Sequence, residues 1–160
     1  MKLLKVRCLI LACGNTLRED DGIGLILALW AKEQWRDDAR VRVLSDHQWT
    51  PEMAEDVAQA EAVVFIDCAT DSAPGIVRCT LVEPATDSTK LGTHHLDAAQ
   101  LLALSKELYG AMPRTSLLLT VGAGSLELRE GLSEAVQAAL SETQEVLKDS
   151  VQRLLGTETT

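Results

Sequence analysis

The feature that most constrains this chain is a buried strand that runs directly into an acidic loop bounded by glycines. Residues Val6 to Cys13 contain almost no polar side chain, which is typical of a central strand covered on both faces. The segment from Gly14 to Gly22 follows and contains the adjacent carboxylates Asp20 and Asp21. The apolar run from Ile23 to Ala31 then predicts a helix that is apolar nearly all round and well buried against the sheet. We therefore expect the acidic loop at the carboxyl edge of a sheet, where open α/β folds bind their ligands.

Strand and helix patterns alternate along the rest of the chain. Further strands are predicted at Val41 to Ser45, Ala62 to Ile66, Ile76 to Val82 and Ser116 to Val121, and further helices at Pro51 to Gln59, Asp97 to Tyr109 and Ser133 to Leu155. This order predicts one α/β domain over residues 1–160, a three-layer α/β/α sandwich around a mostly parallel five-stranded sheet. The strand at 76–82 follows a short loop and is expected to be an antiparallel edge. Right-handed crossovers place the first and third strands side by side.

Composition and charge argue against several classes of function. The 160 residues carry a formal net charge of −9 without a clustered Lys or Arg face, so no nucleic-acid partner is expected. The longest apolar run is far shorter than the ~20 residues of a membrane span, and no secretory cleavage site is evident. These observations predict a cytoplasmic protein that does not bind membranes. The four cysteines are Cys8, Cys13, Cys68 and Cys79, and no two of them have the close spacing of a metal knuckle or a redox pair. We expect them to be reduced core residues.

Two carboxylates and one imidazole can meet at the carboxyl edge of the predicted sheet. Asp21 follows the first strand, Asp67 ends the third, and His94 lies in the loop before the helix at 97–109. Because imidazole suits zinc, copper, iron and nickel, these side chains are a plausible ligand set for a divalent transition metal. Three protein ligands also leave positions open for water or a substrate atom. The pattern does not choose between His94 and His95.

Other interpretations of the same residues stay open at this point. Asp20 and Asp21 can simply favour the positive end of the following helix, and His47 is first a surface residue and second a contact at the rim of a site. Receiver domains also place acidic residues after the first and third strands and bind magnesium. A receiver would need a Lys where this chain has Thr120-Val121-Gly122. A metal-dependent hydrolase of small molecules is a third possibility.

The motifs of this chain resemble those of the hydrogenase maturation endopeptidases. The resemblance rests on Gly14-Asn15-x-Leu17-x-x-Asp20-Asp21-Gly22-x-Gly24, on Val64-Phe65-Ile66-Asp67-Cys68-Ala69 with Pro74-Gly75, on Thr93-His94 before Leu101-Leu102, and on Gly122, Gly131 and Leu132-Ser133. It covers nearly the whole chain and implies a phosphorylase/hydrolase-like fold. Members of this family are nickel-dependent proteases that remove a C-terminal tail from the large-subunit precursor of nickel–iron hydrogenases.

The resemblance also implies a site. It makes Asp21, Asp67 and His94 the nickel-binding residues, with Asp21 and Asp67 as the catalytic carboxylates of an aspartyl-type endopeptidase. His94 is preferred to His95 by its distance to the Leu101-Leu102 pair. The nickel is expected to belong to the hydrogenase precursor, and the free enzyme is not expected to hold it tightly.

Two departures from the family pattern bear on the substrate. Ala12 stands where family members often have Gly, and Asp46-His47-Gln48-Trp49-Thr50 stands where many have Asp-Gly-Gly-Thr. The second region is expected to help choose the hydrogenase, and its His-Gln-x-Thr-Pro-Glu form resembles the branch that serves cytoplasmic, soluble-type hydrogenases. The candidate substrate-binding residues are Gly14, Asn15, Asp46, His47 and Gln48.

Overall fold

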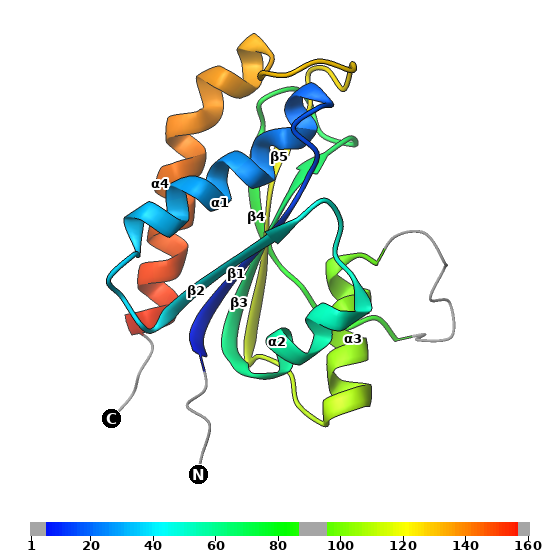
Figure 1. Cartoon of the computed structure of the whole chain (residues 1–160), viewed down its shortest axis with the longest axis vertical. Coiled ribbons are helices and arrows are strands. Elements are labelled where there is room, and N and C mark those ends of the chain that lie inside the picture. Colours follow the sequence, from blue (N-terminus) through cyan, green and yellow to red (C-terminus); the bar gives the residue numbers. More distant parts are fainter. Residues whose placement is uncertain (1–5, 87–95, 157–160) are drawn as a thin grey trace.

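The computed structural model describes residues 6–86 and 96–156, in which a five-stranded sheet lies between two layers of helices (Figure 1). The strands are β1 (Val6–Cys13), β2 (Val41–Asp46), β3 (Ala60–Ala69), β4 (Val77–Leu81) and β5 (Thr115–Gly122). The helices are α1 (Ile23–Gln34), α2 (Ala54–Ala58), α3 (Ala98–Tyr109) and α4 (Glu134–Gly156), with short 3₁₀ turns η1 (Glu19–Gly22) and η2 (Pro51–Met53). Every predicted strand and helix is present.

The strands lie in the order β2-β1-β3-β5-β4 across the sheet. Neighbouring strands are parallel except for β4, which runs antiparallel to β5 at one edge. The predicted mostly parallel sheet, its antiparallel edge strand and the contact between the first and third strands are therefore confirmed. Flavodoxin-like sheets such as those of receiver domains have the strand order 2-1-3-4-5. The observed order thus argues against the receiver interpretation.

Alternate side chains of β1 point into two separate cores, because successive residues of a strand face opposite sides of the sheet. Those facing α1 and α4 are Cys8, Ile10 and Ala12, and those facing α2 and α3 are Leu9, Leu11 and Cys13. In β3, the same alternation places Asp67 two residues beyond Phe65, which belongs to the core beneath α2 and α3. Cys13 and Asp67 therefore lie on one face of the sheet, at its carboxyl edge.

The predicted burial of α1 against the sheet is confirmed, and that of the cysteines is wrong in part. The helix α1 buries Ile23, Leu27 and Ala31 fully against the sheet, but Leu29 on its outer side is 68% exposed. A helix in an outer layer can bring one face to the sheet, and its other face meets solvent whatever its residues. Cys79 is likewise exposed, because it lies on the edge strand β4, although all four cysteines are free thiols as expected.

The last helix packs on the sheet along the predicted face. Its fully buried positions include Val136, Leu147 and Val151, and Leu132, Leu140 and Leu154 pack at the margin of the same core. The opposite face of α4 is polar, as the amphipathic pattern predicts. Among the described residues, no helix is both long and apolar enough to cross a membrane.

The acidic loop closes tightly between β1 and α1, and two of its glycines are required by this close packing. A Cβ atom at Gly14 would lie 2.0 Å from the carbonyl oxygen of Asp21, and one at Gly24 would lie 2.2 Å from that of Cys13. Both neighbours are backbone atoms, which cannot move aside by changing a rotamer. The spacing of glycines in this motif therefore reflects the shape of the strand-to-helix connection.

Candidate active site

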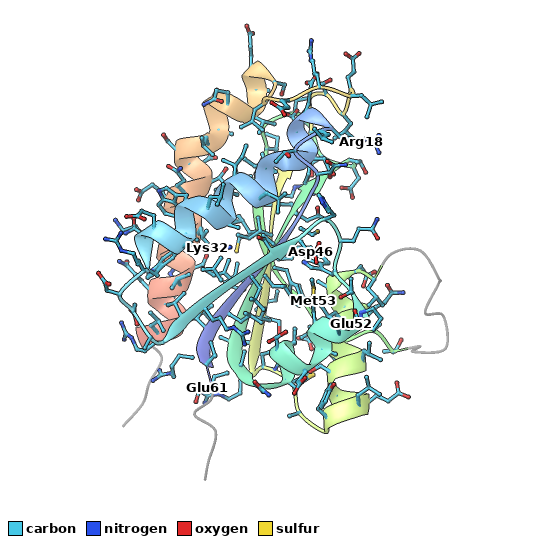
Figure 2. The ribbon with its side chains drawn as sticks, viewed as in Figure 1. Arg18, Lys32, Asp46, Glu52, Met53 and Glu61 are labelled. Atoms are coloured by element: carbon cyan, nitrogen blue, oxygen red, sulfur yellow. The ribbon has the colours of Figure 1, made fainter. Side chains whose placement is uncertain are left out.

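A cavity of about 600 Å³ opens at the carboxyl edge of the sheet. Arg18 and Asp46 mark this edge, and Glu61 lies at the opposite edge (Figure 2). The predicted site residues that line the cavity are Gly14, Asn15, Asp21, His47, Gln48 and Asp67. The sequence patterns did not predict the remaining lining residues, which are Cys13, Arg18, Trp49, Thr70, Leu96, Asp97 and Leu126. The topology thus brings the two predicted catalytic carboxylates to one cavity.

Asp21 is held at the cavity by hydrogen bonds within its own loop. The backbone N–H of Asn15 donates to the Asp21 carboxylate at 3.0 Å and to the Asp21 carbonyl oxygen at 3.1 Å. The side-chain oxygen of Asn15 accepts from the N–H of Leu17 at 2.9 Å, which closes an Asx turn. These bonds fix the loop and leave the carboxylate of Asp21 on the cavity wall.

Asp67 is partly buried, and its pKa is raised. Burial is the main cause, and the nearby charge of Asp21 adds to the rise in the pKa of Asp67. Hydrogen bonds oppose it: the N–H of Cys68 donates to the carboxylate at 2.7 Å, and the Cys13 thiol donates from the neighbouring strand. Since a carboxylate with a raised pKa is a stronger base, Asp67 is suited to accept a proton from water.

The two thiols beside the site, those of Cys13 and Cys68, are not activated as nucleophiles. Burial, followed by the charge of Asp67, raises the pKa of Cys13 above the range in which a thiol ionises near neutral pH. Burial and the charge of Asp21 raise the pKa of Cys68 to about 12. Because the thiolate is the reactive form, both cysteines behave here as neutral groups, and Cys13 serves as a hydrogen-bond donor.

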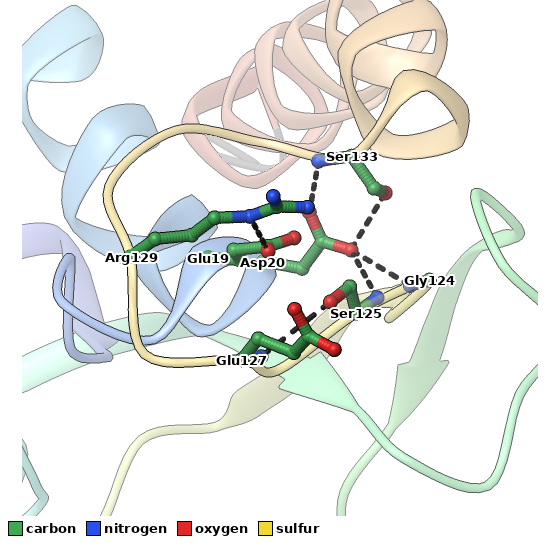
Figure 3. Close-up of polar contacts among 7 residues, drawn as sticks. All are labelled: Glu19, Asp20, Gly124, Ser125, Glu127, Arg129 and Ser133. Atoms are coloured by element: carbon green, nitrogen blue, oxygen red, sulfur yellow. Dashed lines mark hydrogen bonds and ion pairs between the residues drawn. The ribbon is translucent and has the colours of Figure 1, made fainter.

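Asp20 is fully buried and has a different task from its neighbour Asp21. Its carboxylate accepts hydrogen bonds from the N–H groups of Gly124, Ser125 and Ser133 at 2.7, 2.9 and 2.7 Å, and from the Ser133 hydroxyl at 2.7 Å (Figure 3). Burial alone would raise its pKa, but these hydrogen bonds, led by those from Ser133, outweigh it and lower the pKa of Asp20.

Asp20 is linked through Ser133 to the start of the last helix, α4. The Ser133 hydroxyl accepts from the N–H of Val136 at 3.5 Å, in the first turn of α4. Asp20 is therefore placed near the N-terminus of α4, in addition to preceding α1 along the chain. The alternative that Asp20 favours the positive end of α1 stays a prediction, since the hydrogen bonds of its carboxylate described above go to residues before α4.

A second contact joins the same two loops. The guanidinium of Arg129 pairs with the buried carboxylate of Glu19, and the N–H of Glu19 donates to the carbonyl oxygen of Arg129 at 2.9 Å (Figure 3). Glu19 has a φ angle of 40°, in the left-handed region, which persists where surrounding contacts fix the backbone. We call these contacts, together with those of Asp20, the loop clamp. The clamp holds residues 14–22 against residues 123–133, from which Leu126 reaches the cavity.

The predicted substrate-binding residues after β2 are placed differently from one another. His47 and Gln48 are exposed and line the cavity. Asp46 is not part of the lining: its carbonyl oxygen accepts from the N–H of Gly14 at 3.1 Å, and its carboxylate accepts from the N–H of His47 at 2.7 Å. A role for Asp46 in substrate binding stays a prediction.

The predicted third metal ligand, His94, and its alternative, His95, lie outside the described residues. Leu96 and Asp97, which follow them in the sequence, line the cavity. Asp97 is the N-cap of α3, as predicted, and accepts from the N–H of Gln100 at 2.8 Å. Within residues 6–86 and 96–156, no group of three or more His, Cys, Asp or Glu side chains is placed to hold a metal ion.

Sequence reasoning missed the loop clamp and the tryptophan on the cavity wall. Asp20 and Gly124 are separated by 104 positions, so no local pattern links them. The Ser133 that completes the clamp does carry a signal, since a Ser before an amphipathic run is a typical N-cap. For Trp49, the signal was its position directly after the candidate residues His47 and Gln48.

The structure was compared with known proteins once this geometry was established. No protein-family model matches the sequence, and the search of curated proteins found no match either. Among solved structures, the hydrogenase maturating endopeptidase HybD from E. coli is 24% identical, with a TM-score of 0.73 over 92% of this chain and 93% of that one. The [NiFe] hydrogenase maturation protease HycI from Thermococcus kodakarensis KOD1 is 24% identical, with a TM-score of 0.70 over 91% of this chain and 92% of that one.

A third similar structure comes from an archaeon. The hydrogenase 2 maturation peptidase from Thaumarchaeota archaeon SCGC_AB-539-E09 is 23% identical, with a TM-score of 0.66 over 91% of this chain and 98% of that one. Identities at this level establish a common fold. The chain therefore has the α/β fold of the hydrogenase maturation endopeptidases over nearly its whole length, and the resemblance seen in its motifs is confirmed at the level of the fold.

Proposed function

We propose that this protein is an endopeptidase that removes the C-terminal extension of a nickel–iron hydrogenase large-subunit precursor after nickel has been inserted. The observation that carries the proposal is the convergence of Asp21 and Asp67 on one cavity at the carboxyl edge of the sheet. The fold supports it, because similar structures bear the names of hydrogenase maturation proteases. We place the reaction in the cytoplasm.

In the proposed reaction, water attacks the carbonyl carbon of the scissile peptide bond. A carboxylate removes a proton from that water, and the same proton then passes to the leaving amine as the C–N bond breaks. Asp67 is the proposed base, because burial raises its pKa. Asp21, held by the N–H of Asn15, lies on the same cavity and can orient the water or the substrate.

Nickel enters this proposal as part of the substrate. Asp21 and Asp67 supply carboxylate oxygens, and His94 is the proposed imidazole ligand; imidazole suits nickel, whereas carboxylates favour harder ions. Such a set is expected to recognise nickel that the precursor already holds, and to retain little of it alone. The metal would position the tail and report that insertion is complete. The contribution of Leu96 and Asp97 to the cavity supports a role for the segment that precedes them.

The segment after β2 is proposed to choose among hydrogenases. His47 and Gln48 are exposed on the cavity rim, where a substrate loop would pass. Gly14 and Asn15 form the adjacent wall. The partner is the precursor of a soluble-type hydrogenase, as the His-Gln-x-Thr-Pro-Glu form suggests.

The direct test is an assay with a purified, nickel-loaded precursor and the variants Asp21→Asn, Asp67→Asn and His94→Ala. We expect each to lose at least 100-fold in rate, in line with the ~10²–10⁴-fold contribution of positioned acid–base groups. Asp37→Asn, at an exposed position outside the cavity lining, is the matched control and should cut normally. Unchanged tail removal by all three variants would discard the site.

Two further measurements separate the proposal from its competitors. Protein dialysed against a chelator should contain no stoichiometric nickel or zinc; retention of either metal would contradict a substrate-borne ion. Hydrolysis of small esters or amides without any precursor would instead favour a small-molecule hydrolase.

A further inference from the structure

Trp49 has a polar atom without a partner at the wall of the cavity. The residue is 6% exposed, and its ring packs edge-on against Phe65 with ring centroids 5.2 Å apart. Among the described residues, its indole Nε1–H is the buried side-chain polar group for which no hydrogen-bond partner is found. The same side chain lines the cavity together with Asp21 and Asp67.

An unpaired buried donor is costly and therefore informative. Leaving such a group unsatisfied lowers the stability of the folded protein, and the large majority of buried polar atoms in folded proteins are paired. A phenylalanine at this position would keep the packing on Phe65 and avoid the cost. The N–H of Trp49 is thus better explained by an acceptor that arrives with a ligand than by a role in folding.

We infer that the indole N–H of Trp49 donates a hydrogen bond to a main-chain carbonyl oxygen of the precursor's C-terminal segment when that segment occupies the cavity. This inference rests on the proposed function and names a contact by which the site holds its substrate. Because the Nε1 atom is withdrawn from solvent in the free protein, the inference includes a turn of the indole edge toward the cavity as the segment binds.

The charges that line the cavity favour a neutral acceptor for the Trp49 N–H over a carboxylate. Three carboxylates, Asp21, Asp67 and Asp97, outnumber the one guanidinium, that of Arg18, so the lining has a net negative character that opposes a further carboxylate at the Trp49 wall. A neutral carbonyl oxygen meets no such repulsion, and an extended peptide offers one at every residue. Trp49 would therefore bind the backbone of the tail, while His47 and Gln48 on the same connection are free to contact its side chains.

The test compares Trp49→Phe with the wild-type protein on the nickel-loaded precursor. Losing one hydrogen bond of this kind should lower kcat/KM about 3- to 10-fold, mainly through KM, without lowering the melting temperature. Trp30→Phe is the matched control, because Trp30 lies in α1, packs against the core on the other face of the sheet and contacts Trp35. It should leave kcat/KM unchanged.

A second substitution removes the N–H without altering the shape of the ring. Benzothienylalanine incorporated at position 49 replaces the indole N–H by sulfur, and it should reproduce the loss seen in Trp49→Phe. Full kcat/KM for this protein, or for Trp49→Phe, would overturn the inference and leave the proposed function intact. If the wild-type protein fails to cut the loaded precursor, the proposed function falls and the inference falls with it.

Discussion

The replacement of Asp20 by Asn tests whether the loop clamp supports the fold. The two side chains have nearly the same shape, so the change removes charge and one acceptor oxygen and little else. In the native protein, Ser133 N–H donates to one oxygen of Asp20, and the other oxygen receives Gly124 N–H, Ser125 N–H and the Ser133 hydroxyl. An Asn amide must therefore point its NH₂ group at one or more buried donors, whichever way it is turned.

The expected loss of stability follows from these contacts. One buried N–H left without an acceptor costs about 2 kcal/mol, and replacing a charged acceptor by a neutral one weakens the remaining bonds by about 1 kcal/mol in total. The free energy of unfolding should thus fall by about 3 kcal/mol. For a protein of this size, such a loss lowers the melting temperature by about 6–12 °C.

Urea denaturation followed by circular dichroism measures this difference at pH 7. Asp37→Asn, an exposed carboxylate between α1 and β2, serves as the control and should change the free energy of unfolding by less than about 0.5 kcal/mol. A loss below 1 kcal/mol for Asp20→Asn would refute the argument that the clamp stabilises the folded protein.

The pH dependence gives the same prediction an independent check. Because the pKa of Asp20 is lower in the folded protein than its ordinary value of 3.8, its ionised form stabilises the fold at every pH above that value. This contribution is lost as the pH falls through the folded pKa. The stability gap between wild type and Asp20→Asn should be constant from pH 7 to about pH 5 and shrink below pH 4. A gap that widens on acidification would show that the sign of the pKa shift is wrong.

Two further substitutions test the geometry around the site. Gly24→Ala should lower the free energy of unfolding by about 2–3 kcal/mol, because its Cβ would lie 2.2 Å from a backbone oxygen, whereas Gly156→Ala, in open space, should be neutral in urea denaturation. Asp67→Asn should abolish tail removal yet raise stability at pH 7 by about 1 kcal/mol, because burial raises the pKa of Asp67 and so disfavours its ionised form. That gain should fade as the pH falls below the ordinary pKa of 3.8, where the carboxyl group becomes protonated in both states, and a clear loss of stability at pH 7 would contradict it.

The parts of this structure that sequence reasoning predicted are those fixed by local pattern. The strand β1 has the predicted bounds, Val6–Cys13, because a buried central strand and its terminal glycine leave little choice. The strand β3 extends beyond its predicted apolar run to Ala60–Ala69. Its ends contain Glu61 and Asp67, whose polar side chains break the apolar pattern without breaking the hydrogen bonds of the backbone.

The parts that it did not predict depend on contacts between distant segments. The position of Asp21 after the first strand already favoured it as the site residue, but the sequence pattern did not show what its neighbour Asp20 does. What separates them is the arrival of residues 124–133 beside the first loop, which gives Asp20 several donors and leaves Asp21 facing the cavity. The unpaired N–H of Trp49 is equally invisible in the sequence, since pairing is a property of the packed structure.

Adjacent carboxylates in the first loop thus have different roles: Glu19 and Asp20 form structural contacts, and Asp21 lines the cavity. The buried carboxylates of Asp20 and Glu19 form hydrogen bonds and an ion pair that join the first loop to the segment before α4. Those of Asp21 and Asp67 lie at the cavity, where burial makes the ionised form of Asp67 costly. The contacts of Asp20 and Glu19 hold the loop that carries Asp21 beside the costly charge of Asp67, which is the arrangement expected when a reactive site needs buried charge. Asp20→Asn and Asp67→Asn should therefore shift stability in opposite directions at pH 7, although the two carboxylates lie at the same edge of the sheet.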